Sequence, residues 1–307
     1  MSEHVFGPVP SRRLGRSLGV DLVPFKTCSF DCLYCQLGCT TDKTLERRPY
    51  IPVREVVDQV AAALAGEPQP DYVTLSGSGE PTLHAAMGEV VAALKGLTTI
   101  PVAVLTNGSL MWNEDVRQAC AQADLVLPTL AARDEAGFQR IHRPCPGLTL
   151  RQHMRGLVAF RREYPTVPMW LELFLLEGLN TSEEDRRAFA DLIDQIRPDR
   201  VQLNTSVRPT AEPDASAVPM EKLQRWADVL GPEAEVIADI ALAHRGPSSA
   251  TESDVLALCR RRPCTLEQIA AALSVHRNEA AKYVAALRAA NSIQARRKGG
   301  QEYYHSR

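Results

Sequence analysis

Three cysteines lie close together near the start of the chain, in Cys28-Ser-Phe-Asp-Cys32-Leu-Tyr-Cys35. Thiolates at such short intervals can hold a compact iron–sulfur cluster. Three cysteine ligands leave one iron of a four-iron cluster without a protein ligand. An open iron can bind and activate a small molecule, whereas a fully ligated cluster mainly transfers electrons. The loop therefore predicts an open cluster held by Cys28, Cys32 and Cys35.

Two other metal sites remain as alternatives. Cys39 follows the loop and would complete four thiols for a structural zinc ion, although such sites usually draw two close cysteine pairs from separated parts of a chain. Cys32, Cys35 and Cys39 also have part of the spacing of a ferredoxin, but the proline and further cysteines of that motif are missing. The spacing favours the open cluster over both.

Length and composition are those of a globular protein. The chain has 307 residues, of which 45% are hydrophobic and 23% charged, enough for a sizeable core and about two domains. The first residues do not resemble a secretory signal, and no apolar stretch approaches 18 residues. We therefore expect a cytoplasmic protein whose eight cysteines are thiols or metal ligands.

Short apolar runs alternate with amphipathic segments from about residue 18 to 204. Strands are predicted at 18–23, 72–75, 102–105, 125–127, 168–176 and 200–203, and helices at 53–65, 84–95, 113–122, 149–163 and 181–196. This alternation predicts an α/β fold with parallel strands and crossover helices. Sites in such folds lie at the carboxyl ends of the strands, and each suspicious motif follows a strand.

The motifs at these strand ends are polar or rich in glycine. They are the cysteine loop, Ser76-Gly-Ser-Gly79-Glu80-Pro81, Thr106-Asn107-Gly108, Glu177-Gly-Leu-Asn180 and Asn204-Thr205. Glycine lets a backbone approach a ligand closely, although the same residues also favour plain turns. Glu172 interrupts an apolar strand, and Gln202 and Asn204 are either site residues or satisfied core polar groups. Arg12, Arg13 and Arg16 precede the first strand and either clamp a phosphate or carboxylate or belong to a solvated loop.

The C-terminal part has a different pattern. Residues 206–218 predict an irregular loop, followed by a helix at 219–230 and an apolar run near 234–242. Helices are then expected at 251–261, from Thr265, and at 277–290, before a hairpin that turns at Lys298-Gly-Gly. Three helices and a hairpin predict a winged helix-turn-helix domain over 251–307.

This C-terminal domain is basic, with 10 Lys or Arg against 5 Asp or Glu in a chain of net charge −2. His276, Arg277, Lys282 and Arg288 would lie on its third helix, and Arg296, Arg297 and Lys298 on the wing. That arrangement fits nucleic-acid binding, although such domains also dock proteins.

The cysteine loop resembles that of radical S-adenosylmethionine enzymes. The resemblance implies a six-unit partial (β/α) barrel over residues 1–245, open on one side, in which a [4Fe-4S] cluster on Cys28, Cys32 and Cys35 binds S-adenosylmethionine and cleaves it to a 5′-deoxyadenosyl radical. It places Tyr34 beside the adenine and Gly79 with Glu80 at the methionine ammonium. Asn107, Glu172 and Asn204 are further candidates for contacts with the cofactor or the substrate, and the electron would come from a donor such as flavodoxin or ferredoxin.

Over about residues 5–245, the chain resembles a narrower group within this family. The arginine run, Gly-Ser-Gly-Glu-Pro-Thr-Leu, Thr-Asn-Gly-Ser-Leu and Arg143-Pro144 resemble bacterial and archaeal radical enzymes related to wybutosine synthesis in tRNA. Those relatives tend to have Ser-Leu-Asp-Ala where this chain has Thr129-Leu-Ala-Ala132. No cysteine precedes Cys28, so the second cluster of the wybutosine enzyme, and with it wybutosine chemistry, is not expected. We expect Cys39, Cys120 and Cys145 to be buried thiols, and Cys259 and Cys264 to be structural.

Two classes of function follow. The first is a radical oxidoreductase or transferase that abstracts hydrogen from a nucleic acid such as tRNA, from a peptide or protein, or from a metabolite. The second is a DNA-binding iron–sulfur redox sensor. The Gly-Ser-Gly-Glu-Pro turn and the barrel-like alternation favour the enzyme, because a sensor needs neither.

Overall fold

The computed structural model describes residues 4–66, 68–206, 215–237, 251–273, 275 and 277–306. Its largest sheet has eight strands, in which β1 runs antiparallel to β2 and every other neighbouring pair is parallel. In spatial order they are β1 (Val5–Ser11), β2 (Gly15–Val20), β5 (Tyr72–Leu75), β6 (Val102–Thr106), β7 (Leu125–Leu130), β8 (Trp170–Leu175), β9 (Arg200–Thr205) and β10 (Ala234–Val236). The predicted α/β fold with a mostly parallel sheet is confirmed.

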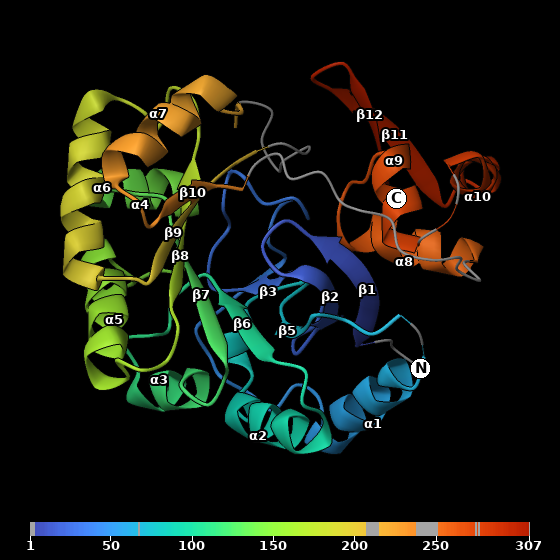
Figure 1. Ribbon diagram of the computed structural model, residues 1–307, viewed down its shortest axis with the longest axis horizontal. Helices are drawn as coiled ribbons and strands as arrows, with labels where there is room; N and C mark the ends of the chain where they lie inside the picture. The colour runs from blue at the N-terminus through green and yellow to red at the C-terminus, as the bar shows by residue number, and fades with distance from the viewer. Residues whose placement is uncertain are drawn as a thin grey trace.

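Helices connect the parallel strands and lie around the outside of the curved sheet (Figure 1). They are α1 (Val53–Leu64), η1 (Pro81–Leu83), α2 (Met87–Leu97), α3 (Glu114–Cys120), α4 (Glu135–His142), α5 (Leu150–Glu163), α6 (Glu183–Ile196) and α7 (Met220–Leu230). Each amphipathic helix turns its apolar stripe to the strands, as Val56 and Val60 of α1 and Leu157 and Phe160 of α5 do in the main core. This packing fixes the strand ends that carry the polar motifs.

Two elements differ from the sequence-based expectation. Residues 5–11, where no strand was predicted, form the edge strand β1, whose pairing with β2 shifts register between Phe6 and Val9. Its prolines are tolerated because an edge strand leaves one side of its backbone unpaired. Helix α4 was not expected at all. It begins at Asp134, which accepts a hydrogen bond from the Gly137 amide at 2.7 Å, and ends at Arg143 in a left-handed conformation with φ of 45°.

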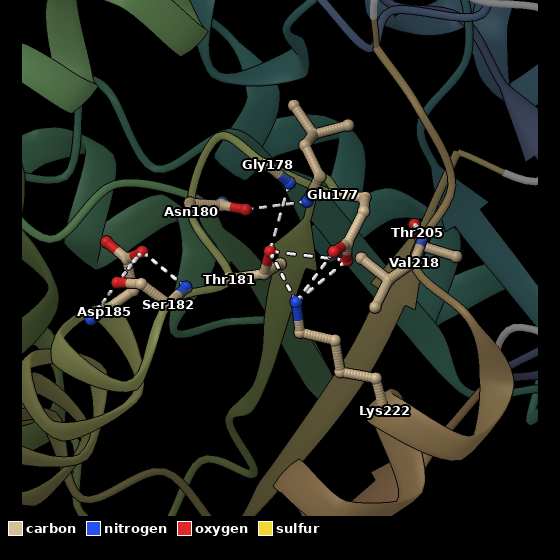
Figure 2. A network of polar contacts seen from close by, with 10 residues as sticks. Glu177, Gly178, Asn180, Thr181, Ser182, Asp185, Thr205, Val218 and Lys222 are labelled. Carbon is tan, nitrogen blue, oxygen red and sulfur yellow. Dashed lines mark hydrogen bonds and ion pairs between the residues drawn. The ribbon is translucent and has the colours of Figure 1, made fainter.

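The loop after β8 is fastened to α7 (Figure 2). The Lys222 ammonium pairs with Glu177 at 2.8 Å and donates to the Thr181 hydroxyl at 3.1 Å. The Asn180 amide closes the same loop, because its oxygen accepts from the Leu176 amide at 2.7 Å. This strand-end motif, grouped above with the site, therefore joins a helix to the sheet.

The C-terminal part contains α8 (Glu252–Arg261), α9 (Leu266–Leu273), α10 (Arg277–Ala289), β11 (Ile293–Lys298) and β12 (Gln301–Ser306). The predicted order of three helices and a hairpin is thus present, and these elements share a core of their own. They lie beside β1 (Figure 1), where Leu258 and Ala272 pack on Val9.

Several expectations about this part fall outside what the structure describes. His276, most of the loop at 206–218 and the predicted boundary near residue 245 lie outside the described residues, as do the side chains of Arg277 and Lys282. Arg288, Arg296 and Arg297 are exposed, whereas the Lys298 ammonium reaches the Ala215 carbonyl oxygen at 3.5 Å. Within the described part, no helix is long and apolar enough to cross a membrane.

Candidate cluster and cofactor site

The cysteine loop follows β2. The end of α4 and the residues just after it hold the loop in place through backbone hydrogen bonds. The Asp31 amide donates to the His142 carbonyl at 2.9 Å, and the Leu33 amide donates to the Ile141 carbonyl at 3.0 Å. Further along, the Cys145 amide donates to the Ser29 carbonyl at 2.8 Å. The helix that the sequence did not reveal is therefore the main support of the loop.

Each of the three cysteine sulfurs has one side-chain nitrogen within hydrogen-bond distance. The Asn107 amide nitrogen is 3.5 Å from Cys28, His142 Nδ1 is 3.4 Å from Cys32, and the Lys26 ammonium is 3.3 Å from Cys35. The Asn107 amide and the Lys26 ammonium donate, and His142 donates to Cys32 in the tautomer that carries its hydrogen on Nδ1, an atom that also lies 3.4 Å from the Tyr34 hydroxyl oxygen. Hydrogen bonds of this kind orient thiolate ligands and tune the cluster that they hold. Lys26 belongs to the cysteine loop itself, whereas the fold brings Asn107 and His142 to the loop from the ends of β6 and α4.

Without a bound metal, the Cys28 and Cys32 thiols are difficult to deprotonate at this site. Burial, followed by the nearby Glu80 carboxylate, raises the pKa of Cys28 to about 12. Burial and the two neighbouring thiols raise the pKa of Cys32 well above its usual range. Bound iron would supply the positive charge that buried thiolates need. The residues present therefore fit an iron–sulfur cluster held by Cys28, Cys32 and Cys35.

The remaining cysteines correct part of the sequence-based expectation. Cys120, Cys259 and Cys264 are buried, but Cys39 is exposed and Cys145 is half-buried. No three histidine, cysteine, aspartate or glutamate side chains among the described residues are arranged to hold a single metal ion.

The glycine-rich turn after β5 packs directly on the cysteine loop. A Cβ at Gly79 would overlap the Thr27 carbonyl oxygen, so only glycine permits this approach. Gly77 has φ of +139° and lies against Asp21, whose carboxylate accepts hydrogen bonds from the Ser78 amide and hydroxyl. The turn therefore positions the loop, whatever else it contacts.

Glu80 is buried and links the turn to the end of β6. Its carboxylate accepts hydrogen bonds from the Thr82 backbone N–H at 3.1 Å, the Thr106 hydroxyl at 2.6 Å and the Asn107 backbone N–H at 2.7 Å. Burial raises its pKa, while these hydrogen bonds act in the opposite direction. Glu80 thereby fixes Asn107, whose side chain reaches Cys28.

A cavity of about 340 Å³ opens beside the cysteine loop. It is lined from the loop by Tyr34 and Cys35, from the sheet by residues that include Thr74, Glu172, Phe174 and Asn204, and from outside the parallel sheet by Arg12, Arg13, Leu258, Arg261 and Arg262. The Tyr34 ring stacks on Phe174, with ring centroids 3.9 Å apart. Of the predicted cofactor-binding residues, Tyr34, Glu172 and Asn204 line the cavity, whereas Gly79, Glu80 and Asn107 lie beside the cysteine loop.

Glu172 is the centre of a buried polar network on the cavity wall. It pairs with Arg13 at 2.8 Å and accepts from the Thr129 hydroxyl and the Asn204 amide at 2.7 Å each. Burial alone raises the pKa of Glu172, but the Arg13 guanidinium and the two hydrogen bonds outweigh it, so that the net pKa lies below the ordinary value. Gln202, by contrast, contacts Glu235 of β10 at 2.9 Å and is not among the lining residues.

Sequence reasoning missed two buried histidines next to the cluster loop. His142 and His153 pack with Phe30 and Phe138 in one aromatic group. Burial lowers the pKa of both, that of His153 to about 4, so both rings are neutral at pH 7. The only sequence signal was indirect, because His142 directly precedes the Arg143-Pro144 pair that marks the end of α4.

Comparisons with known proteins identify the superfamily of the chain. Residues 22–193 match the model of the Radical SAM superfamily. The chain is 36% identical to a protein named GTPase Obg from Brachyspira hyodysenteriae over 88% of its own length, and 38% identical to a UPF0026 protein of Methanocaldococcus jannaschii over 67%. It spans 40% and 64% of the lengths of these two relatives.

The fold is likewise shared with a solved structure. A radical SAM methyltransferase from Sphaerobacter thermophilus matches 72% of this chain and 65% of its own, with a TM-score of 0.55 and 19% sequence identity. The chain belongs to the radical SAM superfamily, whose members use a [4Fe-4S] cluster and S-adenosylmethionine. This membership gives no support to the DNA-binding redox sensor.

Proposed function

We propose that this protein is a radical S-adenosylmethionine enzyme in which Cys28, Cys32 and Cys35 hold the cluster and the adjoining cavity receives the cofactor and a substrate. The observation that supports this most strongly is the set of three cysteines, each with its own nitrogen donor, at the edge of a cavity of about 340 Å³. When bound, the reduced cluster and S-adenosylmethionine supply one-electron cleavage of the cofactor and hydrogen abstraction from a substrate.

The chain's own residues then have separate tasks. Tyr34 contacts the adenine from the cavity wall, since it is the member of the loop whose ring lies on that wall. By the family resemblance, Gly79 and Glu80 contact the ammonium group of the cofactor's methionine. Glu80 also accepts a hydrogen bond from the backbone of Asn107, whose side chain contacts Cys28. Glu172 and Asn204, which are hydrogen-bonded to each other, form a polar part of the cavity wall that faces the cofactor or substrate.

We further propose a subgroup, a reaction type and partners for this enzyme. The motifs quoted above support a proposal that the enzyme is one of the bacterial and archaeal relatives of the wybutosine-synthesis enzyme, acting as an oxidoreductase or transferase with flavodoxin or ferredoxin as electron donor. The helices α8 to α10 and the hairpin form a winged helix-turn-helix domain. Exposed Arg296 and Arg297 on that hairpin are its candidate nucleic-acid contacts. A salt-sensitive gel shift with tRNA or DNA, lost in an Arg296→Gln, Arg297→Gln double variant, would support this role.

The cysteine assignment is tested by single substitutions. Cys28→Ala, Cys32→Ala and Cys35→Ala should each retain less iron after anaerobic reconstitution and abolish cofactor cleavage, because a four-iron cluster cannot be held by two thiolates. Cys39→Ala, which removes the exposed thiol of the same segment, is the matched control and should behave as the wild type. Iron content, the electron paramagnetic resonance spectrum and 5′-deoxyadenosine formation are the readouts. Loss of the cluster in Cys39→Ala would instead make that residue a ligand.

A further inference from the structure

Four arginines from two distant parts of the chain line one end of the cavity. Arg12 and Arg13 belong to the turn between β1 and β2, and Arg261 and Arg262 belong to the end of α8. Glu172 is the single carboxylate among the described residues that line the cavity. Asp21, which is not among the lining residues, pairs with Arg261. Even with Asp21 counted, the arginines here outnumber the carboxylates among the described residues.

The arginines are held in defined positions. Arg13 pairs with Glu172 at 2.8 Å, and Arg12 donates to the Asn204 amide oxygen at 2.9 Å. Arg261 lies over the Phe6 ring, 3.8 Å from its centroid, while it pairs with Asp21. Guanidinium groups fixed in this way bind a carboxylate or phosphate with little loss of side-chain entropy.

The concentration of positive charge is reflected at Arg12. Its pKa is lowered to about 10, mainly because of burial and next because of the Arg13 charge, with Arg262 acting in the same direction. No carboxylate among the described residues forms an ion pair with Arg262. Bringing several guanidinium groups around one enclosed space is unfavourable unless an anion enters it.

We infer that this arginine end of the cavity binds an oxyanion of the substrate, a carboxylate or phosphate on a small molecule, and that the C-terminal domain supplies half of the site. The inference rests on the proposed function and adds a substrate class to it. A small molecule is favoured over a macromolecule because the cavity measures about 340 Å³ and α8 lies along its wall. The C-terminal domain then takes part in substrate binding itself.

Calorimetric titration of the full-length, cluster-loaded protein tests this inference. The probes are inorganic phosphate and malonate, each in buffer of matched ionic strength, so that the two arms distinguish a phosphate from a carboxylate substrate. We expect saturable binding of one probe, weakened about tenfold or more in Arg262→Gln, because one charge-assisted contact is lost. Arg260→Gln removes an exposed arginine of the same helix outside the cavity and should bind as the wild type does.

Further outcomes decide the inference. Arg12→Gln, checked for folding by circular dichroism, should weaken the same probe. Binding of neither probe, or equal loss in Arg260→Gln and Arg262→Gln, would overturn the anion site. Formation of 5′-deoxyadenosine is measured in parallel. If the cofactor is cleaved while neither probe binds, only the anion site is wrong. If a probe binds without any cofactor cleavage, the proposed enzyme is wrong and the site loses its role in substrate binding.

Discussion

The side chains around the three cysteines come from places that no local pattern connects. Asn107 follows β6, His142 ends α4, and Lys26 lies in the cysteine loop itself, yet each places a nitrogen next to one sulfur. The ligands were predictable from their spacing, whereas their donors depend on tertiary contacts across as many as 110 residues of sequence. For the same reason Glu80, expected only at the cofactor, also serves as a buried link between two strand ends.

At this scale His142 should tune the cluster. His142→Phe keeps the ring packed on Phe30 and Phe138 but removes the nitrogen next to Cys32. In the tautomer with its hydrogen on Nδ1, His142 donates to Cys32 and stabilises the more electron-rich reduced cluster. We therefore expect the midpoint potential to fall by roughly 20–60 mV in the variant, the equivalent of one hydrogen bond of about 1 kcal/mol. A redox titration followed by electron paramagnetic resonance measures this.

The matched control for this substitution is His153→Phe. His153 belongs to the same aromatic group but contacts no cysteine sulfur in the described structure. Its replacement should leave the potential unchanged. Equal shifts in both variants would show that packing, and not the nitrogen donor, sets the potential.

Glu172 should contribute stability that depends on pH. Glu172→Gln leaves the half-buried Arg13 without the carboxylate that pairs with it and changes the centre of a buried network, which should lower the free energy of unfolding by about 3 kcal/mol at pH 7. The pKa of Glu172 lies below the ordinary value of 4.5. The contribution is therefore complete above that value and is lost as the pH falls through the lowered folded pKa.

Urea unfolding of the metal-free protein at a series of pH values checks this. The difference between wild type and Glu172→Gln should stay constant from neutral pH down to about 4.5 and narrow only below it. Glu177→Gln, which breaks the more exposed pair with Lys222, should cost less than about 1 kcal/mol. A Glu172 effect that is no larger than the Glu177 effect would contradict the buried network.

At the scale of elements, hydrophobic patterning located the parallel strands and their long crossover helices. It failed at β1, where Pro8 and Pro10 hide an edge strand, and at α4, a helix of only eight residues whose apolar pattern is too short to be distinctive. Both misses concern the site, because β1 leads into the arginine turn and α4 supports the cysteine loop. Caps mark α4 better than its apolar pattern does, since Asp134 begins it and a left-handed Arg143 ends it.

The support given by α4 can be tested through its N-cap. Asp134→Ala removes the hydrogen bond to the Gly137 amide and should lower the free energy of unfolding by about 1 kcal/mol. Because α4 carbonyls hold the cysteine loop, the variant should also release cluster iron faster to a chelator. Asn113→Ala removes the N-cap of α3, which does not contact the loop, and should destabilise similarly without faster release. Equal rates of iron release in the two variants would show that α4 does not help to retain the cluster.

At the scale of the molecule, the C-terminal elements α8 to β12 and the parallel sheet meet at the cavity. The order of its elements was predictable from caps and the glycine turn, but its position was not, because the contacts of Leu258 with Val9 and of Arg261 with Asp21 join residues more than 200 positions apart. The sequence favoured a separate basic module. The structure instead brings two of its arginines to the cavity wall.

Packing of α8 and α9 on β1 should therefore affect both the stability of β1 and binding at the cavity. Leu258→Ser places a hydroxyl in the small cluster with Val9 and Ala272, which is distinct from the domain's own core. We expect faster amide hydrogen exchange in β1 and weaker binding of the anionic probe, with exchange in α10 unchanged. Val255→Ala, a substitution in the domain's own core, should speed exchange in α8 to α10 instead. Unchanged exchange in β1 of Leu258→Ser would contradict the docked arrangement.

Product formation by the anaerobically reconstituted wild-type protein tests the assignment of the three cysteines most directly. With dithionite and S-adenosylmethionine, we expect 5′-deoxyadenosine, detected by mass spectrometry, and none from Cys32→Ala under the same conditions. A wild-type protein that carries the full cluster and yields no 5′-deoxyadenosine would contradict the assignment of Cys28, Cys32 and Cys35 to cofactor cleavage.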